Sequence, residues 1–147
     1  MFLKISEFKK AMKSALKTSG GLVIGNVKGH FLVHASLWGV WVESIYATSK
    51  FKAAIVELIG DMPEEETCYR YRLEEKTLKM EYQVSYEDPY DKWKEAKDFA
   101  CEIPLVFYSS PHELAVYQIN SDRSYVTVLQ SYAAGMMSPA ELEAGME

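Results

Sequence analysis

Three lysines near the amino terminus have the spacing that best fits a defined chemistry. Lys9, Lys13 and Lys17 follow one another at intervals of four residues, within a segment that we predict to be helical. Side chains four residues apart lie on the same face of a helix. A line of ammonium groups suits a line of phosphates or of acidic side chains. The spacing predicts a polyanion-binding surface, and a merely solubilising basic face is the alternative that it leaves open.

The later part of the chain offers the opposite kind of surface. Its acidic side chains gather in predicted loops and at the start of a predicted helix, where they resemble the phosphate array that a basic protein binds. Paired acid–base catalysis would need one of them desolvated in a cleft, and no sequence pattern indicates this. We therefore predict that six carboxylates bind a protein partner: Glu64, Glu65, Glu66, Glu87, Asp88 and Asp91.

No other group of residues fits a catalytic or cofactor site. His30 and His34 would lie ~13 Å apart along a strand, too far for one metal ion. Cys68 and Cys101 form no CxxC motif, so we expect two buried free thiols, with a disulfide between them as the alternative. The glycines of residues 20–29 match no phosphate-binding loop. We predict no catalytic residue, no cofactor, no metal and no enzymatic activity, although a small enzyme without a familiar motif stays open.

The charge is divided between the two ends of the chain. Residues 1–52 hold eight lysines against two glutamates, a net charge of +6, whereas the later residues carry −11, and the whole chain carries −5. Such a division suggests contact with a polyanion, a charged protein or a second copy of the chain. Because the whole chain is acidic, we place a protein partner before nucleic acid and keep a homodimer as a further alternative.

Length and composition are those of one globular domain. The chain has 147 residues, 48% of them hydrophobic and 25% charged, which is enough for one core, and we predict a single domain over residues 1–147. The amino terminus lacks the continuous apolar run of a signal peptide, and no 18 apolar residues run together. We therefore expect a cytoplasmic protein with no membrane contact.

The elements that would position these residues alternate between helices and strands. Ser6 is the expected N-cap of the first helix, and Thr48 or Ser49 is that of a second helix ending at Gly60. Short apolar runs predict three strands in residues 21–42 and three more in 102–108, 113–119 and 124–131. Short helices are predicted after Asp88 and from residue 138. The predicted fold is α+β, with a mostly antiparallel sheet of about six to eight strands.

The most regular alternation predicts a long hairpin in residues 68–86. Apolar and charged residues alternate with a period of two, which places one face in the core and the other in water. The side chains expected in the core are Tyr71, Leu78, Met80, Tyr82 and Val84.

The order helix, short strands, helix, hairpin resembles one repeat of a DNA sliding clamp. The segments that carry the resemblance are residues 8–16, 30–42 and 52–84. The resemblance implies basic helices that line a hole for DNA, sheets that form the outer rim, and assembly of several copies into a ring. Lys9, Lys13 and Lys17 fit this arrangement, whereas Glu57 and the acidic residues 64–66 do not.

Overall fold

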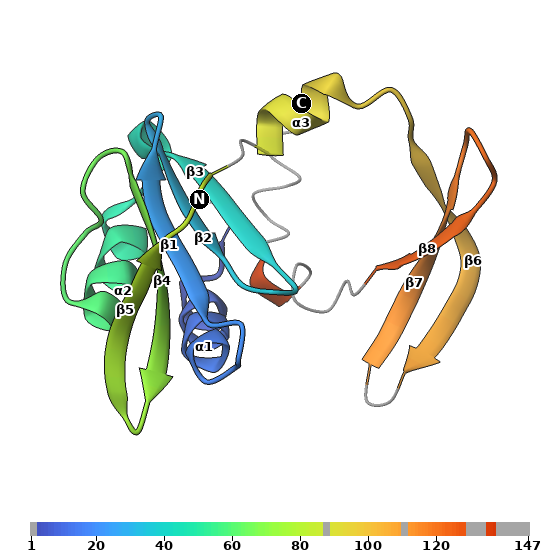
Figure 1. The fold of residues 1–147 in the computed structure, drawn as a ribbon. Coiled ribbons are helices and arrows are strands. Elements are labelled where there is room, and N and C mark those ends of the chain that lie inside the picture. The colour runs from blue at the N-terminus through green and yellow to red at the C-terminus, as the bar shows by residue number, and fades with distance from the viewer. Residues whose placement is uncertain (1–2, 87–88, 110–111, 129–134, 138–147) are drawn as a thin grey trace. The chain divides into compact units, whose positions relative to one another are not determined.

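The computed structural model describes residues 3–86, 89–109, 112–128 and 135–137 (Figure 1). The chain divides into two compact units, the first made of Met1–Tyr86 with Gly135–Glu147 and the second of Glu87–Ala134. Within the described residues the structure has three α-helices and eight strands in two antiparallel sheets. The predicted α+β class and number of strands are confirmed, but within the described residues the strands form two sheets rather than the single sheet predicted.

The first unit has the predicted order of helix, three strands, helix and hairpin. Its five strands form one sheet in the order β3-β2-β1-β4-β5, so that β1 lies at the centre. Its elements are α1 (Ile5–Leu16), β1 (Leu22–Val27), β2 (His30–His34), β3 (Gly39–Glu43), a short 3-10 turn (Ser44–Tyr46), α2 (Ser49–Ile59), β4 (Thr67–Glu74) and β5 (Thr77–Gln83).

The two helices pack against the same face of this sheet (Figure 1). The rings of Phe8 in α1 and Phe51 in α2 are stacked with their centroids 5.4 Å apart, and both side chains are fully buried. Phe51 also contacts Phe31 of β2 at a centroid distance of 6.2 Å. This packing confirms the apolar stripes predicted for both helices, because burial of such a stripe is the main source of helix stability in a protein.

The helix ends agree with the sequence prediction only for α2. Thr48 caps it by accepting a hydrogen bond from the Phe51 amide at 3.2 Å, and Gly60 ends it with a φ of 92°. The predicted Ser6 cap of α1 is wrong, since α1 begins at Ile5 with Lys4 at the N-cap position. The Lys4 amide donates instead to the Met136 carbonyl at 2.7 Å, which holds the chain extended just before the helix.

The other face of the sheet has a smaller apolar cluster. Val23, Leu32 and Cys68 are buried there. After β5 the chain returns over this cluster, and Tyr86 stacks on Trp41 of β3 with ring centroids 5.1 Å apart. Both faces of the five-stranded sheet therefore carry apolar contacts.

The predicted hairpin is present, but its register corrects the predicted core. Tyr71 is buried and pairs with Met80, whereas Tyr69 pairs with Gln83, so the register shifts between them by a bulge. Met80 is 58% exposed and Tyr82 53% exposed, so both were wrongly predicted to lie in the core. The reason is that β5 is an edge strand, and the bulge turns the residues after Met80 toward the opposite face.

The other two predicted core residues of β5 and the segment after it, Leu78 and Val84, are half-buried as expected, but Val84 lies on the opposite face of the sheet. Leu78 is half-buried opposite Leu73. Val84 is half-buried too, but it packs on the cluster of Val23, Leu32 and Cys68.

The second unit contains α3 (Pro89–Glu95) and a sheet of three strands in the order β6-β7-β8. These strands are β6 (Ala100–Ser109), β7 (His112–Ile119) and β8 (Tyr125–Val128), which confirms the three strands predicted in this region. The predicted cap at Asp88 and the predicted helix from residue 138 lie outside the described residues.

Candidate functional site

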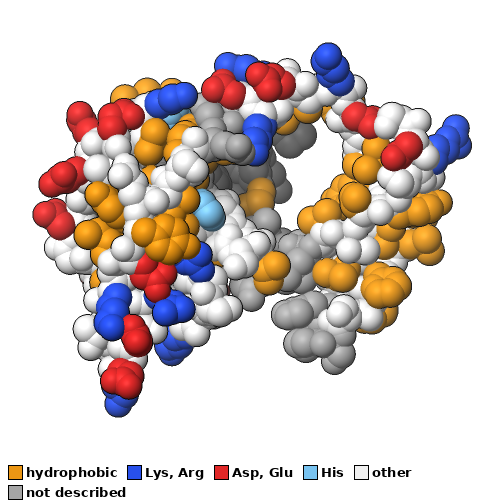
Figure 2. Space-filling model, in the orientation of Figure 1, with side chains coloured by type: hydrophobic (Ala, Val, Ile, Leu, Met, Phe, Trp, Pro, Cys, Tyr) orange, Lys and Arg blue, Asp and Glu red, His pale blue; other side chains and the backbone are white. Residues whose placement is uncertain are grey.

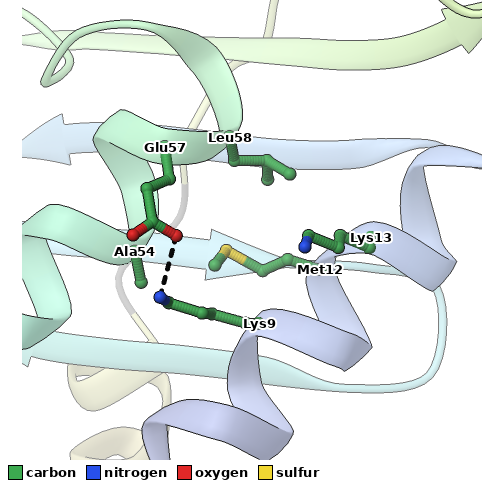
Figure 3. A pocket seen from close by; sticks show the side chains of 6 residues that line it. All are labelled: Lys9, Met12, Lys13, Ala54, Glu57 and Leu58. Carbon is green, nitrogen blue, oxygen red and sulfur yellow. Dashed lines mark ion pairs between the residues drawn. The ribbon is translucent and has the colours of Figure 1, made fainter.

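A groove between α1 and α2 contains two of the three predicted lysines (Figure 3). It has a volume of about 290 Å³ and is lined by Lys9, Met12, Lys13, Ala54, Glu57 and Leu58. Lys9 Nζ lies 2.8 Å from Glu57 Oε2. The hydrogen bond and charge of Lys9, with a smaller effect of Lys13, lower the pKa of Glu57. The groove therefore contains an ion pair as well as one ammonium group beside it.

The predicted line of three lysines is only partly free to bind an anion. Lys9 is engaged by Glu57, and the neighbouring Lys10 lies 2.8 Å from Glu7. Lys13 and Lys17 are exposed and make no ion pair within the described residues. Sequence analysis could not reveal the Lys9–Glu57 pair, because it forms between helices that are separated in the sequence by three strands.

The second helix adds basic residues that the sequence analysis did not assign to this surface. Lys50 and Lys52 in the first turn of α2 are exposed and have no ion-pair partner in the described part of the chain. Residues 5–17 and 49–59 together hold six lysines and two glutamates. The helix layer is therefore the basic side of the first unit.

The six predicted carboxylates do not all belong to one unit. Glu64, Glu65 and Glu66 are exposed in the loop between α2 and β4 of the first unit. Glu66 also has a local role, because its Oε1 accepts a hydrogen bond from the Lys28 amide at 3.1 Å. Asp91 lies in α3 of the second unit, 4.0 Å from Lys94 Nζ, whereas Glu87 and Asp88 lie outside the described residues.

The second unit presents an apolar sheet face that the sequence analysis did not identify as a site. The β6–β7 register pairs Phe107 with Leu114, and Ile103 with Val116. The β7–β8 register adds Tyr125 opposite Gln118 and Thr127 opposite Val116. Paired residues share a face of the sheet. This face holds no Lys, Arg, Asp or Glu, and we call it the uncharged face; by register it carries Cys101, Ile103, Phe107, Ser109, His112, Leu114, Val116, Gln118, Tyr125 and Thr127.

Much of the uncharged face is accessible to solvent. Phe107 is 60% exposed and Tyr125 is 62% exposed, whereas Val116 is buried. The opposite face of the same sheet also exposes apolar side chains, namely Val106, Tyr108, Val126 and Val128, but it differs by carrying Glu102 and Glu113 in register with Tyr117 and Tyr108. Figure 2 shows apolar side chains gathered over this sheet. The strands were predicted from their alternation, but alternation does not show whether anything covers a face.

His30 and Cys68 make packing contacts inside the first unit. The His30 ring contacts Trp41 in a tilted arrangement with a centroid distance of 4.3 Å, and its Nδ1 lies 2.8 Å from the Lys28 carbonyl oxygen. Both thiols are free, and burial raises the pKa of Cys68, whereas Cys101 is exposed and was wrongly predicted to be buried. Within the described ranges, no three His, Cys, Asp or Glu side chains are grouped as a metal site would require.

In the described part of the chain, no helix has both the length and the apolar character needed to cross a membrane. Comparisons with known proteins give no family model, no curated protein and no solved structure that matches the chain.

Proposed function

We propose that this chain is a non-catalytic binding protein that docks on a partner protein through the uncharged face of β6, β7 and β8. The observation that carries the proposal is the exposure of Phe107 and Tyr125 on a face whose register holds no Lys, Arg, Asp or Glu. Large apolar patches on a soluble protein mark interaction sites, and aromatic residues are enriched in the cores of such interfaces.

The charge of the second unit indicates the chemistry of the partner. Residues 87–134 hold eight acidic and four basic side chains, a net charge of −4. This charge opposes binding to nucleic acid or to an anionic membrane surface. It favours a partner whose apolar patch is surrounded by lysine and arginine, which agrees with the acidic, protein-binding surface predicted from the sequence.

Site-specific photo-crosslinking in the native host tests this proposal. A benzophenone amino acid would replace Phe107 or Tyr125 in the full chain, and adducts would be identified by mass spectrometry. The matched control is Tyr108, the next residue along β6, which is 76% exposed and belongs to the opposite face. We expect one protein to be captured from Phe107 and from Tyr125 but not from Tyr108.

Three other outcomes would contradict the proposal. Adducts that contain only copies of this chain would make the face a self-association surface. Equal capture from Phe107 and Tyr108 would mean that the uncharged face is not the docking surface. A complete absence of adducts, with the chain folded and abundant, would mean that no partner covers it.

A second candidate function is favoured by the helix layer of the first unit. Lys13 and Lys17 of α1 and Lys50 and Lys52 of α2 are exposed without carboxylate partners in the described residues, which suits contact with a phosphate backbone. The resemblance to a sliding-clamp repeat supports the same surface, since basic helices line the DNA hole of such clamps. We keep this nucleic-acid-associated role as the alternative.

A further inference from the structure

Another pocket, of about 250 Å³, lies in the first unit on the sheet face opposite the helices. The register places His34 of β2, Val23 of β1 and Arg70 of β4 in one row across three neighbouring strands. Gly20, Gly21, Ala35 and Ser36 from two loops, with Tyr82 and Val84, complete the wall. None of these lining residues carries a carboxylate, whereas two of them, His34 and Arg70, can carry positive charge.

Arg70 is held in place with part of its hydrogen-bonding capacity unused. Its Nη1 donates to Tyr82 Oη at 2.6 Å, and its Nη2 donates to the Ser19 carbonyl oxygen at 2.9 Å. A guanidinium group has five N–H donors, so about three remain. One of them is on Nε, which is buried and has no hydrogen-bond partner in the described structure. Glu81 Oε2 lies 3.6 Å from this Nε, so the N–H groups left for a ligand are the second ones on Nη1 and Nη2.

The charge near Arg70 is only partly neutralised. Glu81 is its nearest carboxylate, with Oε2 3.6 Å from Arg70 Nε. The same carboxylate lies closer to Arg72, whose Nε is 3.0 Å from Glu81 Oε1. The single carboxylate of Glu81 therefore lies beside the guanidinium groups of both Arg70 and Arg72, so these three side chains together keep a net positive charge. Since the Arg70 side chain is only 24% exposed, this charge is less screened than one on an open surface.

Two glycines let the loop after α1 approach the neighbouring loop and strand closely at the pocket. A Cβ at Gly20 would collide with Ser36 Oγ, so glycine is what allows the Ser36 hydroxyl to reach the pocket wall. Gly21 has a φ of +64°, and a Cβ there would lie 2.5 Å from the Tyr71 carbonyl oxygen. Gly20 thus lies close to Ser36 of the loop between β2 and β3, and Gly21 lies against β4 beside Arg70.

We propose that this pocket binds a small oxyanion, the carboxylate or phosphate group of a compact ligand, with Arg70 as the main contact and His34 and Ser36 beside it. Guanidinium groups recognise both oxyanions through paired N–H donors. The volume is below the ~300–1,000 Å³ of pockets for drug-sized ligands, which limits the ligand to a small molecule. The site lies on the opposite sheet face from the helix layer and is independent of the partner-binding surface proposed above.

Titration of the ¹⁵N-labelled full chain with inorganic phosphate, and separately with acetate, tests the proposal at constant ionic strength. We expect saturable shifts of the Gly20, Gly21 and Ser36 amides, and the stronger of the two titrations identifies the preferred oxyanion. Arg70→Lys keeps the charge but loses the fork of donors, so binding should weaken roughly 10- to 100-fold. Arg72→Lys is the matched control, because Arg72 contacts the same Glu81 without lining the pocket.

A second variant covers the case in which Arg70→Lys disturbs the fold. Ser36→Asp places a carboxylate in the wall and should abolish binding, whereas Ser49→Asp makes the same charge change at an exposed residue of α2 and should not. The proposal is overturned if neither anion produces saturable shifts at the pocket, if Ser36→Asp binds like the wild type, or if the shifts map to Lys13 and Lys17 instead.

Discussion

At the scale of single residues, the sequence predicts the conformation correctly where that conformation depends only on residues close by in the sequence. Thr48 caps α2 as predicted, because an N-cap depends on backbone amides only two or three residues away. The Ser6 cap was wrong because a distant segment, Met136, fixes the residue before α1. Lys9 was correctly placed on the basic helix face, but its partner Glu57 belongs to another helix. Such pairs follow from tertiary packing and leave no local pattern.

The Lys9–Glu57 pair gives a prediction at this scale. The lowered pKa of Glu57 means that its ionised form is favoured in the folded state. The stabilisation is therefore present at neutral pH and is lost as the pH falls through the lowered pKa of Glu57. In Lys9→Gln the pKa of Glu57 should return toward its ordinary value, and Lys13→Gln should change it less, because Lys9 is the larger cause.

Carboxyl ¹³C titration of Glu57 by NMR measures this directly. The effect on unfolding should be small, since the pair lies in solvent and exposed ion pairs contribute little. Equal pKa changes in the two variants would show that the ion pair at 2.8 Å does not persist in solution.

At the scale of elements, periodicity predicted which segments fold but not which face each residue reaches after an irregularity. Leu78, Met80, Tyr82 and Val84 keep a strict period of two, and nothing in that pattern shows the bulge opposite Tyr69 and Tyr71. The strands β6, β7 and β8 were predicted, yet the exposure of their uncharged face was not. Coverage of a face depends on what packs against it, which the strand sequence does not contain.

The packing of α1 on α2 gives a prediction at this scale. Phe51 is fully buried between Phe8 and Phe31, so Phe51→Ala should reduce the free energy of unfolding of the first unit by ~3–5 kcal/mol. Tyr46→Ala is the control, since Tyr46 is 69% exposed and its removal should change stability by less than ~0.5 kcal/mol.

Urea unfolding followed by tryptophan fluorescence in a Trp93→Phe background measures both variants. Trp38 and Trp41 then report on the first unit alone, because Trp93 belongs to the second. A cost for Phe51→Ala as small as that for Tyr46→Ala would mean that the helices do not pack on the sheet as described.

At the scale of the whole molecule, the uneven charge of the chain was visible in the sequence and is distributed by the fold onto particular surfaces. The helix layer holds six lysines against two glutamates, whereas the second unit has a net charge of −4. The association of Lys50 and Lys52 with the same layer as Lys13 and Lys17 required the tertiary structure. The predicted single domain and the predicted homodimer stay predictions.

The alternative nucleic-acid role makes a prediction at this scale. If the helix layer contacts DNA, changing Lys13, Lys17, Lys50 and Lys52 to Gln should weaken binding and reduce its salt dependence. The slope of log K against log salt should become shallower by ~0.9 for each phosphate of duplex DNA that the protein no longer neutralises. The melting temperature should hardly change, because all four side chains are exposed and unpaired within the described residues.

Fluorescence anisotropy with a labelled duplex at several salt concentrations provides the measurement. A control with the same change in net charge replaces four lysines elsewhere with Gln, namely Lys76, Lys92, Lys94 and Lys97. The alternative fails if the wild type does not bind at low salt or if both sets of substitutions weaken binding equally. Neither result bears on the uncharged face of the second unit.

The central position of β1 has a consequence for the chain as it leaves the ribosome. One edge of β1 pairs with β2, which follows after a two-residue turn, so this pairing can form almost at once. Its other edge waits for β4, which is synthesised roughly 40 residues later, a delay of about 2–8 s at ~5–20 residues per second. During that interval Leu22 and Ile24 border an unpaired strand edge, a template to which another nascent chain can add. The nascent chain is therefore most prone to aggregate after β1 and β2 have paired and before β4 has emerged, and a co-translational chaperone would be most useful in that interval.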